Sequence, residues 1–62
     1  MTTYEKVKNR AITLNKSISA IEIEAGIANG TISGWRESRP YAETLDRVAK
    51  VLKVTIEELL PD

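Results

Sequence analysis

Small polar residues and glycines are concentrated between Asn29 and Gly34, where the chain reads Asn-Gly-Thr-Ile-Ser-Gly. An asparagine amide carries both donors and an acceptor, so Asn29 can form two hydrogen bonds with one adenine edge. Ser33 adds a hydroxyl, and Gly30 and Gly34 let another surface approach the backbone closely. These residue types suit hydrogen bonding to bases in a nucleic-acid groove. In a second interpretation, Asn29 is the N-cap of a helix, since Ala28 is a poor cap. The two glycines are then helix residues that the fold tolerates.

The chain lacks most of the residue types that enzymes use for catalysis. It contains no histidine and no cysteine, which removes the commonest general base, a common nucleophile and the usual zinc ligands. Glu22 and Glu24 stand two positions apart, so on a helix they point in different directions. No glycine-rich phosphate loop of Walker spacing is present. We therefore predict that the protein is not an enzyme, has no catalytic residue, and uses no metal ion or cofactor.

Two helical patterns on either side of one glycine must position the Asn29–Gly34 residues. The apolar spacing is three or four before the glycine and three after it, at Ile18, Ile21, Ala25, Ile32 and Trp35. The glycine, Gly26, stands where a left-handed residue commonly ends a helix. A helix, a glycine turn and a second helix over about residues 17–37 predict a helix-turn-helix. The second helix of such a unit can lie in the major groove of DNA.

The remaining chain shows helical patterns only, and no β pattern competes with them. Thr2 with Glu5, and Thr55 with Glu58, have the spacing of a capping box at the start of a helix. The sequence predicts five helices in one all-α domain of residues 1–62, over about residues 2–15, 17–25, 29–37, 41–53 and 55–60.

The start of the second helix has two interpretations. Ser17 is one candidate N-cap. Ser19 is the other, because Glu22 follows three residues later and Ile18 and Ile23 occupy the two hydrophobic-staple positions. Either way, the serine that does not cap lies near a partly positive helix end, where a DNA phosphate is favourably held.

Length and charge set further bounds. A chain of 62 residues allows one small core, which we predict at Ile21, Ala25, Gly26, Ile32, Trp35, Leu45, Val48 and Leu52. Basic and acidic residues cancel, but residues 1–39 hold six basic and four acidic side chains, and residues 40–62 hold three and five. This weak polarity lets the first part face an anion. No apolar run approaches the about 20 residues of a bilayer span, so we expect a cytoplasmic protein without a membrane partner.

With these positions identified, the chain resembles the Cro/phage-repressor (XRE-type) helix-turn-helix family from Tyr4 to Leu60. The similarity is carried by Gly26-Ile27, Thr31-Ile32-Ser33, Trp35, Pro40, Thr44-Leu45, Val48-Ala49, Leu52, Val54 and Glu58-Leu59-Leu60. The segment from Asn29 to Ser33, with Trp35, Ser38 and Pro40, resembles a branch common among phage and prophage repressors. The resemblance implies a compact five-helix lambda-repressor-like fold and a sequence-specific transcriptional regulator that binds a double-stranded DNA operator.

The resemblance also implies roles for individual residues. Asn29, Gly30, Ser33 and Gly34 match positions that face bases. Ser17, Ser19 and Thr31 match positions that hold phosphates, and Arg39 lies in a loop that follows the DNA backbone. A homodimer on DNA is implied, and Ile56 and Leu60 are candidate dimer contacts, although their helical spacing also fits an ordinary core.

The chain departs from the family pattern at three places, one of which is the short loop from Trp35 to Pro40, which leaves fewer DNA-backbone contacts than the longer loops of relatives. Glu22 occupies a position that is commonly alanine, which we attribute to a capping role. An Arg–Glu pair that joins the first and third helices in many relatives is replaced by Ala11 and Arg36, so Arg36 is free to bind a phosphate or Glu37. The zero net charge and the scarcity of Arg and Gln on the base-facing surface also suit an alternative function, a protein-interaction module such as an antirepressor or antitoxin acting on a repressor. The DNA-binding hypothesis fits either a compact Cro-like protein or the headpiece of a longer repressor.

Overall fold

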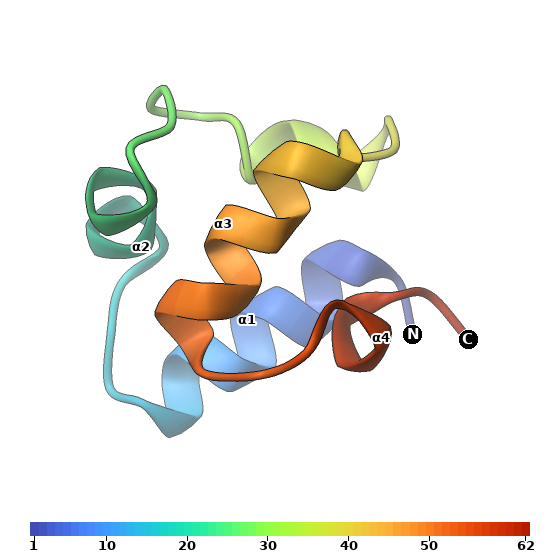
Figure 1. Ribbon diagram of the computed structural model, residues 1–62, viewed down its shortest axis with the longest axis horizontal. Coiled ribbons are helices and arrows are strands. Elements are labelled where there is room, and N and C mark those ends of the chain that lie inside the picture. The colour runs from blue at the N-terminus through green and yellow to red at the C-terminus, as the bar shows by residue number, and fades with distance from the viewer.

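The computed structural model describes residues 1–62 as an all-helical fold with one 3-10 helix in place of the third predicted α-helix (Figure 1). In chain order the elements are α1 (Thr3–Thr13), α2 (Ile18–Ala25), η1 (Ser33–Arg36), α3 (Ala42–Leu52) and α4 (Ile56–Leu59). Helix α3 crosses the middle of the molecule in Figure 1 and packs against α1, α2 and α4, while η1 packs against α1. None of the helices combines the length and hydrophobicity that a membrane-spanning segment requires.

The all-α class is confirmed, but the prediction of five α-helices is wrong, because the structure has four. The difference lies in the segment 29–37, where we predicted one continuous helix. Residues 29–32 form turns, and only the four residues of η1 are helical, with the tighter 3-10 geometry. Gly30 has a φ of 90°, which lies outside any right-handed helix. A regular helix therefore cannot pass through this position.

The predicted caps are present at both ends of the chain. At α1 the Thr2 hydroxyl accepts from the Glu5 amide at 3.2 Å, and the Glu5 carboxylate accepts from the Thr2 amide at 2.9 Å. The same reciprocal pair between Thr55 and Glu58 starts α4. Both capping boxes are confirmed, so at each of these helix starts two amides are satisfied by side chains three residues away.

Helix α2 begins after Ser17, whose hydroxyl accepts from the Ala20 amide at 3.1 Å. The alternative start at Ser19 is therefore wrong. The staple expected with it is wrong too, because Ile23 points into solvent with 76% of its surface exposed. Gly26 ends α2 with a φ of 72°, in the left-handed conformation predicted for it.

One hydrophobic core joins all five elements. Its buried members are Val7, Ala11, Ile21, Ala25, Ile32, Trp35, Leu45, Val48, Ala49, Leu52 and Leu59. Every residue that we predicted for the core is among them except Gly26, which is exposed. Gly26 contributes a backbone conformation rather than buried surface, since it has no side chain to pack. Trp35 keeps only 7% of its surface accessible and anchors η1 to this core.

The two ends of the chain lie side by side (Figure 1). The Asp62 carboxylate pairs with the Met1 ammonium and with the Lys6 ammonium, each at 2.8 Å. The hydrogen bond from Lys6, followed by that from Met1, lowers the pKa of Asp62 to about 2. A charged Asp62 therefore holds α1 and the end of the chain together.

Candidate nucleic-acid interface

Residues 29–36, which we call the reading segment, begin with a turn that is held from behind by Glu22. Glu22 is a residue of α2, and only 3% of its surface is exposed. One carboxylate oxygen accepts from the Gly30 amide at 3.2 Å and the other from the Ile32 amide at 3.0 Å. Charge-assisted bonds of this kind are stronger than those between neutral groups. The turn is thus tied to α2 by a side chain and not by helical backbone bonds.

Our sequence interpretation of Glu22, as the partner of a Ser19 cap, is wrong, because the carboxylate points away from the start of α2 and towards the next element. The usable signal was a glutamate at a position that is commonly alanine. That signal did not reveal which amides donate to the Glu22 carboxylate, because they lie 8 and 10 residues further along the chain.

The four residues predicted to face bases are all exposed: Asn29, Gly30, Ser33 and Gly34. Neither the Asn29 amide nor the Ser33 hydroxyl forms a hydrogen bond within the protein. The interpretation of Asn29 as an N-cap is wrong, since no helix begins there and the segment that follows is capped by no side chain. Behind this exposed surface, Ile32 is fully buried and Trp35 nearly so. The reading segment therefore presents polar groups outward from an apolar anchor.

The residues predicted to bind phosphates occupy several different environments. The Ser17 hydroxyl is engaged as a helix cap, whereas Ser19 is exposed and forms no hydrogen bond within the protein. Thr31 is half-buried, and its hydroxyl donates to the Ala28 carbonyl at 2.7 Å. Arg39 is exposed and has no acidic partner. Ser19 and Arg39 thus have all their donors available to an external ligand.

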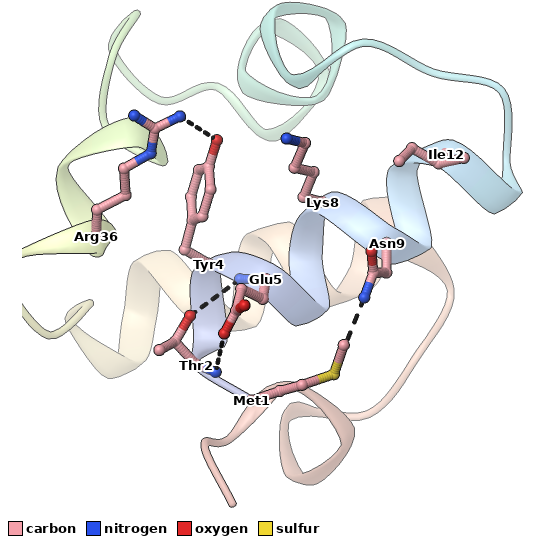
Figure 2. A pocket seen from close by; sticks show the side chains of 8 residues that line it. All are labelled: Met1, Thr2, Tyr4, Glu5, Lys8, Asn9, Ile12 and Arg36. Carbon is pink, nitrogen blue, oxygen red and sulfur yellow. Dashed lines mark hydrogen bonds between the residues drawn. The ribbon is translucent and has the colours of Figure 1, made fainter.

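Arg36 binds Tyr4 and not Glu37. Its guanidinium donates to the Tyr4 hydroxyl at 2.7 Å and lies over the tyrosine ring, 4.6 Å from the ring centre (Figure 2). The contact links η1 to α1 across 32 residues of sequence. The sequence analysis did not identify Tyr4 as a partner for Arg36, because the two residues are distant in sequence. The remaining guanidinium N–H groups stay free.

A shallow hollow of about 730 Å³ lies beside this pair, along the exposed side of α1. Figure 2 shows Tyr4, Arg36 and the Lys8 side chain extending to the same side of α1, with Met1 and Glu5 on the other side. Lys8 has no acidic partner, and Glu5 is engaged in its capping box. This side of the hollow is therefore positively charged.

The ion pairs of the protein leave an uneven charge distribution. Lys16 is neutralised by Glu24 at 2.8 Å, and α3 pairs Arg47 with Glu43 and Lys50 with Asp46. By contrast, neither Arg36, the last residue of the reading segment, nor Arg39, which follows it, has an acidic partner. The zero net charge of the chain therefore coexists with two cations between Trp35 and Pro40 that have no acidic partner.

Comparison with known proteins gives consistent results. A family model described as the Cro/C1-type HTH DNA-binding domain matches residues 6–61. Among solved structures, the chain is similar to the P22 c2 repressor protein, which was crystallised with synthetic operator 9T in the presence of Tl⁺. The two chains share 27% sequence identity with a TM-score of 0.86, over 97% of this chain and 94% of that chain. No match was found among proteins of curated function.

Proposed function

Since this chain belongs to the family of Cro/C1-type helix-turn-helix DNA-binding domains, and is therefore a DNA-binding transcriptional regulator, we propose that it places its reading segment in the major groove of an operator. The similar P22 c2 repressor was crystallised with a synthetic operator. In this proposal residues 1–62 form a single DNA-binding domain that acts in the cytoplasm. Its family comprises DNA-binding domains, and the proposed function needs neither catalysis nor a cofactor.

The observation that carries this proposal is the exposed, unbonded polar surface of the reading segment. The Asn29 amide and the Ser33 hydroxyl have no partner in the protein, so they lose no internal hydrogen bond on meeting a base edge. Asn29 is proposed to read adenine through two hydrogen bonds. Gly30 and Gly34 let the backbone approach the groove floor or wall. With so few donors, much of the specificity must come from groove shape, thymine methyl contacts and bridging water.

Phosphate contacts are proposed for five residues in or near this surface in sequence. Ser17 and Ser19 precede this surface in sequence, Thr31 lies within it, and Arg36 and Arg39 follow it. Such contacts set the register of the protein on DNA without reading its sequence. Arg36 is favourable for this role because Tyr4 already restrains its guanidinium, which reduces the conformational freedom lost on binding.

We also propose a homodimer, with Ile56 and Leu60 of the C-terminal region as contacts. Leu60 exposes 45% of its surface although it is a large apolar residue. Both residues line a cleft of about 290 Å³, together with Leu45 and Pro40. Two domains on a pseudo-palindrome would place their reading segments about 34 Å apart, one turn of the double helix.

A second candidate function is a protein-interaction module, such as an antirepressor or antitoxin acting on a repressor. The zero net charge of the chain favours it, because most DNA-binding domains rely on an excess of basic residues. Under this alternative the exposed reading segment would contact a protein and the free cations would be incidental.

Selection of bound sites from a random pool of duplexes tests the proposal. We expect enrichment of a site with two related half-sites, bound with an affinity that falls steeply as salt is added. The slope of log K against log salt should be about −0.9 for each phosphate contacted. A protein that enriches no duplex and binds none at low salt would contradict the DNA-binding proposal, and association with a repressor in the absence of DNA would favour the alternative.

A further inference from the structure

We propose that Glu22 is the positioning residue of the reading segment, and that its buried carboxylate maintains the backbone conformation in which the segment selects an operator. This inference rests on the proposed function, because selection between DNA sites is what the positioning serves. The geometry that supports it comes from α2 and the turn alone.

The partners of the Glu22 carboxylate are unusual for a buried acid. It has no Lys or Arg partner, and its contacts are the Gly30 and Ile32 amides at 3.2 and 3.0 Å. Buried charges in proteins are ordinarily paired or bound to metal. Here two backbone donors take the place of a cation, so the turn and the carboxylate depend on each other.

The protein offers these two amides no acceptor other than Glu22. Residues 29–32 lie outside the regular helices, and neither the Gly30 nor the Ile32 amide has a backbone acceptor. A Cβ at Gly30 would have no heavy atom within 4 Å, so the side-chain position of this residue, whose φ is 90°, faces open space. Buried backbone donors are almost always paired in native proteins. The carboxylate therefore supplies the acceptors that the backbone does not.

The second bond connects this restraint to the core. Ile32 is completely buried, and its amide is one of the two that Glu22 holds. One side chain thus fixes both the exposed glycine of the turn and the apolar anchor that follows. Asn29 lies directly before the restrained residues, so its side chain can meet a base edge in a fixed direction only while the turn is held.

Electrostatics alone would disfavour this arrangement. A negative charge behind a DNA-binding surface repels phosphates, and its removal should strengthen binding to every duplex alike. A positioning role predicts the opposite result for the operator. The two effects have different signs, which makes them separable by experiment.

The test is Glu22→Gln, with Glu24→Gln as the matched control that removes one negative charge from the same helix. Glutamine has one acceptor oxygen where glutamate has two, so at least one of the two amides loses its partner. We measure hydrogen exchange of the Gly30 and Ile32 amides against amides of α3, and affinity for the selected operator against a scrambled duplex at one salt concentration. For Glu22→Gln we expect exchange of these two amides to accelerate about tenfold relative to α3, and the operator preference to fall about tenfold, as for one lost hydrogen bond to a charged group. Glu24→Gln should change neither quantity.

Three results would overturn the inference. They are an equal gain in affinity for both duplexes, an acceleration of exchange spread evenly over α3 and the turn, or an unchanged operator preference. If Glu22→Gln does not fold, Glu22→Asp keeps the charge but shortens the side chain by one methylene, and the same two measurements apply to it with the same expectations. A wild-type protein that binds no duplex would refute the proposed function, whereas the exchange experiment would still decide whether Glu22 restrains the turn.

Discussion

Replacing Gly34 with alanine separates the stability of the reading segment from its fit to DNA. Gly34 lies in η1, its φ is not positive, and a Cβ added there would have no heavy atom within 4 Å. Alanine at such a position lowers the conformational entropy of the unfolded chain, so the folded state should gain about 0.4–1 kcal/mol. For a domain of this size, about 1 kcal/mol raises Tm by about 4–8 °C.

The effect on DNA binding should have the opposite sign. The space around Gly34 is open because nothing in the protein covers it, and the proposed function fills that space with the DNA groove. An added methyl group that meets a packed surface typically costs about 1–3 kcal/mol, which weakens binding about 5- to 150-fold. Gly34→Ala should therefore be more stable than the wild type and a weaker DNA binder.

Thermal unfolding followed by circular dichroism and titration of the selected operator measure the two effects on one protein. Gly30→Ala is the control, because a side chain at a φ of 90° is strained. This substitution should lower the stability of the free protein by about 1–2 kcal/mol, independently of DNA binding. A Gly34→Ala variant that is more stable and binds the operator as well as the wild type would refute the base-facing position of Gly34. A loss of stability would refute the reasoning about open space around η1.

The remaining predictions concern the anchor, the base contact and the chain ends. Trp35→Ala should lower the free energy of unfolding by about 3–5 kcal/mol, which is a large part of the total for a domain of this size, and should largely unfold it. Urea denaturation measures this loss, and an unchanged midpoint would contradict the role of Trp35 as a buried anchor. Asn29→Ala should leave Tm unchanged, since the amide has no internal partner, and should reduce preference for one adenine by about 1–3 kcal/mol in competition binding; a lower Tm with the same preference would contradict the base contact. The hydrogen bond from Lys6 lowers the pKa of Asp62 from 3.8 to about 2. The stabilisation that the charged Asp62 carboxylate provides is therefore complete above pH 3.8 and is lost as the pH falls towards 2. Unfolding measured across that range should show a steeper acid loss for the wild type than for Asp62→Asn, and parallel curves would refute the pairing.

Features that depend on neighbouring residues could be predicted from the sequence. The capping boxes at Thr2 and Thr55 need only a side chain and an amide three residues apart, and both formed as predicted. Gly26 ended α2 because glycine adopts the left-handed conformation without a steric penalty. The apolar spacing in α3 placed Leu45 and Leu52 on one buried face. Such signals act over one or two helical turns, so the amino-acid order contains them completely.

The candidate site was predicted as a location but not as a conformation. The exposed position of Asn29 and Ser33 follows from the spacing of Ile32 and Trp35, which must turn inward. The same spacing suggested a regular helix, and that inference failed at Gly30. Local pattern shows which side of a segment is apolar, but it does not show whether the backbone closes its hydrogen bonds helically.

The tertiary structure decided the contacts between groups that are distant in sequence. Glu22 meets the Ile32 amide across 10 residues, and Arg36 meets Tyr4 across 32. A carboxylate can satisfy a helix start, a cation or a distant turn equally well, and only the packing of α2 beneath the turn selects among these partners. The sequence by itself determined the four α-helices, the two capping boxes and most of the core, because those depend on short-range geometry. The shape of the reading segment arose from folding, because its restraining groups come together only when the core has formed.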